Sequence, residues 1–189
     1  YTNGFVGAGA LGMAVDEYNG DNFDHSGLGF IGGGYIACYT TNARPIESHP
    51  VPEGVPGWGS EWKQSVRANF LKTTNVGVHG ASMAHRSNYL DLDPTYTDRH
   101  GRPLLRMTYD FTLNDRRLTA HLTPVAEEIA RGMGGREVNV AERKGSYDSM
   151  PYQTTHNTGG TIMGTDPQTS VCNRYCQSWD LHNLFVAGA

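Results

Sequence analysis

The stretch Tyr152-Gln-Thr-Thr-His-Asn-Thr-Gly-Gly-Thr-Ile-Met-Gly164 carries more information about this chain than any other. It shows neither the 3.6-residue period of an amphipathic helix nor the alternation of a half-buried strand. Its glycines allow the backbone to take positive φ or to approach a ligand closely. A single histidine, His156, lies among small hydroxyl-bearing residues, and its imidazole suits general-base work near neutral pH. The stretch therefore predicts a loop that serves a functional site.

The run Asn183-Leu-Phe-Val-Ala-Gly-Ala189 follows this loop and is short, apolar and rich in small residues at its end. Such a run predicts a buried strand that enters a tight turn. A buried strand needs neighbouring strands and a covering layer of helix. The start, Tyr1-Thr-Asn-Gly, carries neither a methionine nor a signal-peptide pattern. We therefore expect the chain to be an internal piece of a longer enzyme.

Composition excludes several classes of protein. The net charge is −4 and no basic stripe is present, so we expect no nucleic-acid partner. No apolar run approaches the ~18 residues that a membrane span requires. Glycine accounts for 24 of 189 residues and is clustered in motifs, which is not the pattern of a low-complexity chain. Three cysteines are an odd number, which favours free thiols over a disulfide framework.

Hydrophobic periodicity predicts five elements after a proline-rich loop. A helix is expected to begin near Ser60, with apolar residues at spacing four. Residues 75–79 predict a short strand, and residues 88–94 and 103–109 predict an antiparallel pair. A long helix is expected to begin with Asn114 as its cap and to continue to Met133, with Pro124 either kinking or restarting it.

Two further features concern the last third of the chain. Residues 137–140 predict a returning strand. Composition then shifts towards glycine and threonine, so we place a domain boundary near residue 145.

The motif Gly7-Ala-Gly-Ala-Leu-Gly12 offers an alternative function, a nicotinamide-dependent dehydrogenase that uses Gly7, Gly9 and Gly12. G-x-G-x-x-G binds a pyrophosphate only where it follows a buried strand and opens a helix. Residues 1–6 make a poor strand, and residues 16–21 have turn chemistry. The sequence favours a close-packed loop or turn here.

The histidines and cysteines invite a metal hypothesis, which the spacing does not support. His79 and His85 are six residues apart, the wrong interval for two ligands on one helix face. Cys172 and Cys176 lack a second cysteine pair. His25 is interpreted as a hydrogen-bonded loop histidine. A further alternative is a non-enzymatic carbohydrate-binding module that uses exposed tryptophans and tyrosines.

Several of these motifs together resemble a known family. The run from His156 to Gly164, the pair Ser170-Val171 and the run 183–189 resemble the C-terminal signature of the glucose–methanol–choline (GMC) flavoprotein oxidoreductases. Residues 20–27, 88–94 and 101–106 resemble the branch that contains gluconate, sorbitol and fructose dehydrogenases. The resemblance covers nearly the whole chain.

The resemblance implies an α/β plus α+β fold. In this family FAD lies in a Rossmann-like domain, and a domain built from an antiparallel sheet and helices covers the flavin. Residues 1–145 are then expected to be mainly the substrate-binding or cap domain, with glycine-rich loops. Residues 146–189 are expected to be the C-terminal part of the FAD-binding domain, which is incomplete in this chain.

The resemblance also implies the chemistry of the site. A hydroxyl group of a sugar, polyol or aldonic acid would give hydride to the flavin while His156 accepts the hydroxyl proton. Asn157, Thr158, Gly188 and Ala189 are the implied FAD-binding residues. The implied activity is that of an FAD-dependent dehydrogenase.

The same resemblance implies partner proteins and further segments that are expected outside these 189 residues. Electrons would pass to a cytochrome c or quinone partner, with a small subunit, in a membrane-attached complex on the periplasmic side. We expect the dinucleotide fingerprint before Tyr1 and a second active-site His or Asn after Ala189, so the chain alone is expected to be inactive. The cysteines do not reproduce the arrangement that holds an iron–sulfur cluster in some relatives.

Overall fold

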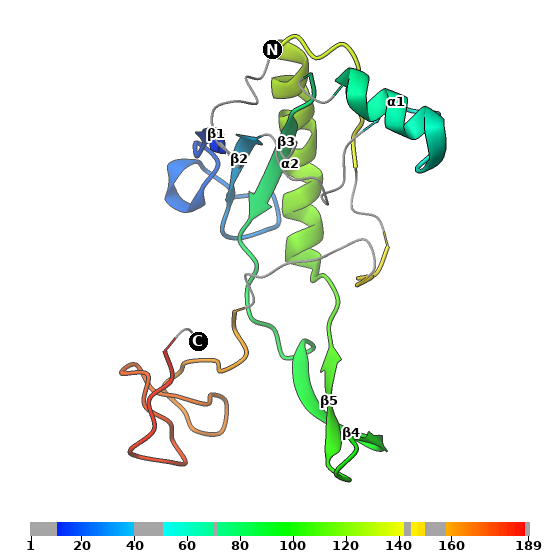
Figure 1. Cartoon of the computed structure of the whole chain (residues 1–189). Helices are drawn as coiled ribbons and strands as arrows, with labels where there is room; N and C mark the ends of the chain where they lie inside the picture. The colour runs from blue at the N-terminus through cyan, green and yellow to red at the C-terminus, as the bar shows by residue number, and fades with distance from the viewer. Residues whose placement is uncertain (1–10, 40–50, 70–71, 142–144, 150–157, 188–189) are drawn as a thin grey trace. The chain divides into compact units, whose positions relative to one another are not determined.

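The computed structural model describes residues 11–39, 51–69, 72–141, 145–149 and 158–187 (Figure 1). The chain divides into two compact units, each made of two separate segments. Unit 1 contains residues 1–81 and 113–144, and unit 2 contains residues 82–112 and 145–189. One boundary falls beside residue 145, but residues 82–112 group with the C-terminal segment. The assignment of substrate-binding and FAD-binding domains stays a prediction.

A three-stranded antiparallel sheet forms the centre of unit 1. Its order is β1 (Leu11–Val15), β2 (Gly34–Tyr39) and β3 (Asn75–Gly80). Along β2 the side chains alternate, so Ile36 and Cys38 are buried. Alternation of this kind places every second side chain on one face of a sheet. The predicted strand over residues 75–79 is confirmed.

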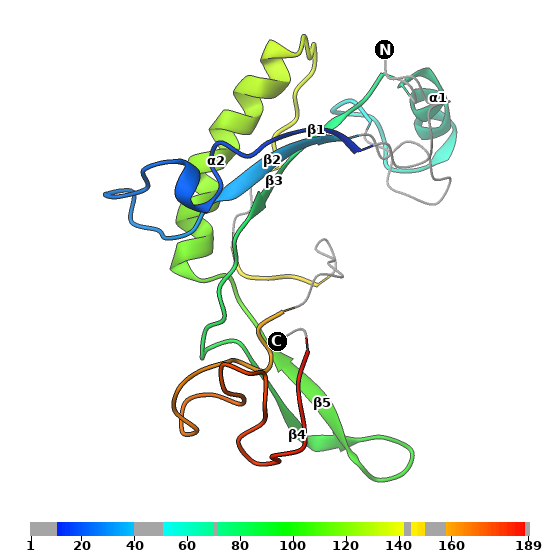
Figure 2. The same ribbon diagram turned by 90° about the vertical axis from the view of Figure 1, so that its left-hand side faces the viewer.

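The long helix α2 (Leu113–Gly132) packs along this sheet (Figure 2). Its buried residues are Leu118, Leu122 and Ala126, which recur at spacing four and therefore share one face. With Phe30 the two leucines form the core of unit 1. The predicted helix is confirmed.

Two details of α2 differ from expectation. The helix does not restart at Pro124, which lies inside it. Residues on both sides of Pro124 are buried, so packing holds the helix together despite the missing backbone donor. Asn114 does not act as a simple cap, because its side-chain amide bonds to the backbone of Ile31.

Helix α1 (Gly59–Asn69) confirms the predicted helix near Ser60 but buries none of its residues. Trp62 is half-buried, and Trp58 just before the helix is 83% exposed. The short 3-10 helix η1 (Gly20–Asn22) lies between β1 and β2.

Unit 2 contains the hairpin of β4 (Tyr89–Thr97) and β5 (Pro103–Thr108), so the predicted antiparallel pair is confirmed. Asp91 lies opposite Arg106 in the register, and the two side chains form an ion pair. The tip is closed by the Asp98 carboxylate, which accepts the backbone N–H groups of His100 and Arg102.

Two predicted strands are wrong. Residues 137–140 have no regular secondary structure. In the described part of the second run, residues 183–187, the structure shows only an isolated bridge between Gln177 and Phe185, and Phe185 is 62% exposed. A buried strand needs a neighbour on each side. Within the described part of the chain no further strand pairs with this segment.

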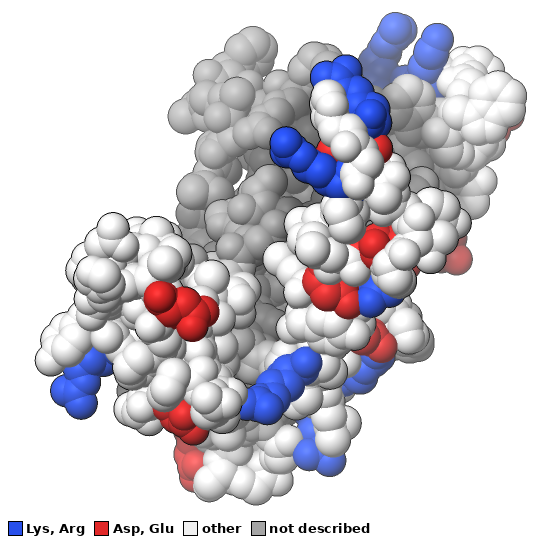
Figure 3. Space-filling view, turned by 90° about the horizontal axis from the view of Figure 1, so that it is seen from below, with Lys and Arg blue, Asp and Glu red and all other residues white. Residues whose placement is uncertain are grey.

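The surface carries charges of both signs. On the face shown in Figure 3, Lys and Arg occur together with Asp and Glu, and neither sign forms a continuous field. Among the described helices, none is long and apolar enough to cross a lipid bilayer.

Candidate functional site

Most of the predicted site residues fall outside the described residues. These are His156, Asn157, Gly188 and Ala189. Thr158 is described and is exposed. The next residue, Gly159, takes a φ of +82°, and a Cβ there would lie 3.1 Å from the Cβ of Ala84. Glycine is therefore required at 159 for its conformation as well as for space.

Backbone hydrogen bonds hold residues 158–187 together as a cluster of turns. Met163 and Cys172 form an isolated parallel bridge, with Val171 N donating to Ile162 O at 2.9 Å and Gly164 N donating to Cys172 O at 2.9 Å. Val186 N donates to Cys176 O at 2.8 Å, which ties the final run back to the cluster. Cys172 is fully buried at its centre. The segment after His156 is thus ordered by its own backbone, without strands or helices.

Ser170 links three parts of this cluster. Its hydroxyl donates to the Asp166 carbonyl at 2.7 Å and accepts from Trp179 Nε1 at 2.9 Å. A Cβ on Gly164 would lie 2.7 Å from the Cβ of Ser170. The group that approaches Gly164 closely is therefore Ser170 of the same chain. The need for glycine at this position is explained without a ligand.

A second set of contacts joins the segment after residue 145 to the β4–β5 hairpin. The Asn88 side chain pairs with the Asp110 backbone through two hydrogen bonds of 3.0 Å. The Asp110 carboxylate accepts the backbone N–H groups of Phe111 at 2.8 Å and Tyr147 at 2.9 Å. The rings of Tyr109, Phe111 and Tyr147 pack edge to face. Asp110 was not predicted, because an aspartate after a strand is also a common turn residue.

The glycine motif at residues 7–12 does not open a helix. Gly12 lies in β1, and a Cβ there would stand 2.1 Å from the backbone oxygen of Cys38 in β2. A dinucleotide fingerprint requires a helix at this point, whose N-terminus faces the pyrophosphate. The structure therefore counts against the nicotinamide alternative.

The histidines considered as metal ligands make other contacts. His79 stacks on Tyr35, with ring centroids 4.7 Å apart, and His85 Nδ1 bonds to Ser87 Oγ at 2.8 Å. The cysteines are free, as predicted, with Cys38 beside Met133. In the described ranges, no three His, Cys, Asp or Glu side chains are grouped as metal ligands.

The family model for GMC oxidoreductases matches residues 84–189, which is more than half of the chain. The chain belongs to the GMC oxidoreductase family. The match contains the turn cluster, the hairpin and the Asn88–Asp110 contact. It confirms the predicted family, and the antiparallel sheets with two helices agree with the α+β part of the predicted fold.

Three relatives of this GMC oxidoreductase carry the names of dehydrogenases. The gluconate 2-dehydrogenase flavoprotein of Pantoea cypripedii is 44% identical over 191 residues, covering 100% of this chain and 31% of that protein. The fructose dehydrogenase large subunit of Gluconobacter japonicus is 30% identical over 68% of this chain and 22% of that protein. The 2-methyl-1,2-propanediol dehydrogenase of Mycolicibacterium austroafricanum is 30% identical over 70% of this chain and 23% of that protein. This chain therefore spans less than a third of each of these relatives.

The stretch that follows His156 in the sequence is neutral and rich in hydrogen-bond donors. Residues 158–165 carry no charged side chain but offer threonine hydroxyls and backbone N–H groups. A Cβ on Gly160 would meet nothing within 4 Å, so the surface is open there. Hydrogen-bond donors that are free of neighbouring negative charge and next to open space are compatible with binding of a phosphate-bearing cofactor.

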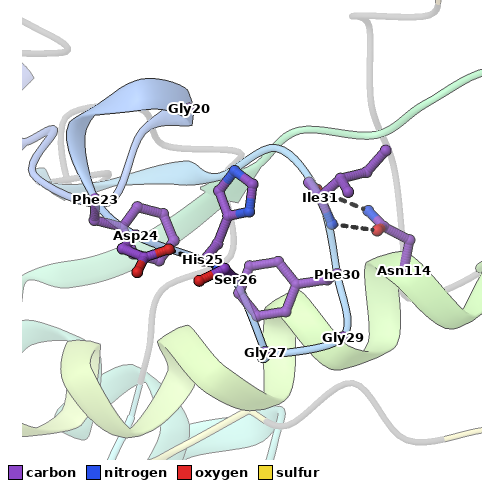
Figure 4. Close-up of a pocket in the computed structure, with 10 residues that line it drawn as sticks. All are labelled: Gly20, Phe23, Asp24, His25, Ser26, Gly27, Gly29, Phe30, Ile31 and Asn114. Atoms are coloured by element: carbon purple, nitrogen blue, oxygen red, sulfur yellow. Dashed lines mark hydrogen bonds between the residues drawn. The ribbon is translucent and has the colours of Figure 1, made fainter.

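A hollow in unit 1 of the GMC oxidoreductase was not predicted. It has a volume of about 740 Å³ and is lined in part by Phe23, Asp24, His25 and Phe30 (Figure 4). His25 was interpreted as a hydrogen-bonded histidine. Within the described residues its ring instead contacts Phe23 and Phe30. The sequence gives no periodic signal for such a site, because its rings come from an irregular loop.

Proposed function

We propose that this GMC oxidoreductase is part of an FAD-dependent dehydrogenase that oxidises a hydroxyl group of a sugar, polyol or aldonic acid. The observation that carries the proposal is the 44% identity, over the whole chain, to a gluconate 2-dehydrogenase flavoprotein. The substrates named for the other relatives, fructose and a diol, also carry hydroxyl groups. Among these substrates, an aldonic acid such as gluconate is the first to test.

FAD supplies the two-electron acceptor in this chemistry, and the protein supplies position and electrostatics. We assign the contacts with FAD to Asn157, Thr158, Gly188 and Ala189. The neutral, donor-rich character of residues 158–165 and the open surface at Gly160 support this assignment.

His156 is proposed as the base that takes the proton from the substrate hydroxyl. Loss of hydride from a carbon is easier as the attached oxygen loses its proton, and imidazole accepts protons near neutral pH. Support comes from the sequence, where His156 directly precedes the glycine and threonine run in a part of the chain that matches the family.

The proposed dehydrogenase passes its electrons to a partner protein. One relative is named as a large subunit, so that protein works with other subunits. We extend this to the present protein and propose a cytochrome c and a small subunit as partners. Copurification from the native host, followed by haem spectroscopy, tests the assembly separately from catalysis.

The decisive experiment is replacement of His156 by Ala in the full-length protein. Turnover of gluconate, fructose and glucitol would be measured with an artificial electron acceptor over a range of pH. We expect the variant to lose at least about 100-fold in kcat on the best substrate, because a general base contributes about that much. The acidic limb of the pH profile should disappear with it.

His182→Ala is the control, because His182 is an exposed histidine of the turn cluster. It should keep the wild-type rate and flavin content. Near wild-type turnover in His156→Ala would remove His156 from the role of base. A folded, full-length protein without bound flavin would overturn the proposed function as a whole.

A further inference from the structure

The hollow in unit 1 is walled by aromatic rings. The rings of Phe23, His25 and Phe30 lie close together, with centroids 5.7–6.4 Å apart in each pair (Figure 4). Phe30 is buried in the core, whereas Phe23 and His25 are half-buried and keep ring surface exposed. His121 of α2 supports Phe30 from behind, at a centroid distance of 5.6 Å. The wall is therefore apolar and partly accessible to a ligand.

Hydrogen bonds to α2 fix the loop that carries these rings. Ile31 N donates to Asn114 Oδ1 at 2.8 Å, and Asn114 Nδ2 returns a bond to Ile31 O at 3.2 Å. Arg117 Nη1 donates to Gly29 O at 2.7 Å. Because the loop is already held in place, a ligand would not have to order it on binding.

The hollow is lined by one carboxylate, and the Arg117 guanidinium lies beside it through its hydrogen bond to the lining residue Gly29. Asp24 is its one charged lining residue when histidine is neutral. Hydrogen bonds from Ser26, through its side chain and its backbone N–H, hold the pKa of Asp24 below the ordinary 3.8. The carboxylate is therefore ionised at neutral pH.

We propose that this hollow binds a small organic cation of the alkylammonium class. Aromatic rings attract a cation placed near their faces, and quaternary ammonium groups are typical ligands of such sites. Asp24 supplies the opposite charge at the rim, while Phe23 and His25 supply the rings. The binding site belongs to unit 1 and does not depend on the proposed catalytic role of His156.

Other ligand classes fit these residues less well. An anion would be repelled by Asp24. A neutral apolar molecule would gain the ring contacts but would leave the carboxylate without a partner. A polyhydroxylated molecule could use Asp24, His25 and Ser26 as hydrogen-bonding groups. It would gain less than a cation does from the charge of the Asp24 carboxylate, which is why we favour the cation.

The test uses tetramethylammonium chloride as the probe and the full-length protein. Binding would be measured by ligand-observed NMR on the methyl signal at constant ionic strength, with tert-butanol as the neutral probe of similar shape. We expect saturable binding of tetramethylammonium and much weaker binding of tert-butanol. Asp24→Asn, which keeps an oxygen for the Ser26 N–H, should weaken binding about fivefold, and Phe23→Leu about threefold.

Matched controls come from unit 2. Asp93 accepts the backbone N–H groups of Thr95 and Tyr96, much as Asp24 accepts that of Ser26, so Asp93→Asn controls for loss of charge. Phe111→Leu controls for loss of a ring. Both controls should bind the probe as the wild type does. Equal binding of tert-butanol, no saturable binding, an equal loss in Asp93→Asn, or displacement of the probe by glucitol would each overturn the proposal.

Discussion

Gly12 is a single residue that matches a sequence motif for a reason unrelated to the function of that motif. Its neighbours match a nucleotide-binding pattern, yet its missing side chain makes room for the backbone of β2. The pairing of β1 and β2 is also irregular here, with a register shift between Leu11 and Met13. Bulges of this kind often contain glycine because they need close backbone approach.

Replacement of Gly12 by Ala should therefore destabilise unit 1. The new Cβ would stand 2.1 Å from the Cys38 oxygen, and relief requires the two strands to move apart. We expect a loss of about 1–3 kcal/mol in the free energy of unfolding, measured by urea titration. Gly57→Ala is the control, because a Cβ there meets nothing within 4 Å. An unchanged urea midpoint in Gly12→Ala would show that the strands do not approach as described.

For single residues, the sequence argued correctly against a nucleotide-binding role for residues 7–12, because their flanking residues lack the strand and helix that the motif needs. The loop or turn expected there is wrong at its end, since Leu11 and Gly12 lie in β1. The role of Asp110 could not be predicted, because its partners Asn88 and Tyr147 are distant in sequence. The same holds for Asn114, whose partner Ile31 lies 83 residues away.

Among the elements, the β4–β5 hairpin depends on a cross-strand ion pair. Arg106 Nε donates to Asp91 Oδ1 at 2.8 Å, and a second contact joins the other nitrogen and oxygen atoms. The hydrogen bonds from Arg106 lower the pKa of Asp91 below the ordinary 3.8. A lowered folded-state pKa stabilises the fold above the unfolded-state pKa, and this stabilisation is lost as pH falls through the folded-state value.

Asp91→Asn should consequently lower the stability of unit 2 at neutral pH but not in acid. Urea midpoints of wild type and variant should differ most above about pH 5 and converge towards about pH 2. Glu53→Gln, which removes an exposed acid of unit 1, serves as the control for the change in net charge. A difference between wild type and Asp91→Asn that stays constant with pH would contradict a role for the ion pair.

Helices with a sustained hydrophobic period and strands with paired alternating patterns were predictable from the sequence. The periodicity of α1 and α2 and the alternation along the hairpin are local properties of the sequence. The runs at 137–140 and 183–189 are short and apolar, and whether such a run becomes a strand depends on its neighbours. Local pattern cannot supply that information.

For the whole molecule, residues 1–189 expressed alone should bind no FAD. The sequence has two G-x-G-x-x-G motifs: residues 7–12 continue into β1, and residues 27–32 are followed by β2. Neither opens a helix, so neither can present a helix N-terminus to the pyrophosphate. Equilibrium dialysis with FAD, on protein shown to be folded by circular dichroism, measures this directly. The full-length protein in the same buffer is the positive control. Stoichiometric binding by residues 1–189 would restore these motifs as candidate sites.

Each unit is built from two separate segments of the chain, and this arrangement affects the order of folding during synthesis. Unit 1 is completed only by α2, because Leu118 and Leu122 form its core with Phe30. A ribosome therefore releases the first 81 residues and the whole hairpin before the sheet of unit 1 can bury its face. The hairpin contacts are local and should form early, whereas closure of unit 1 spans a long loop and should come late. During that interval the nascent sheet would expose apolar surface, so synthesis of this protein should depend on chaperones that bind the emerging chain.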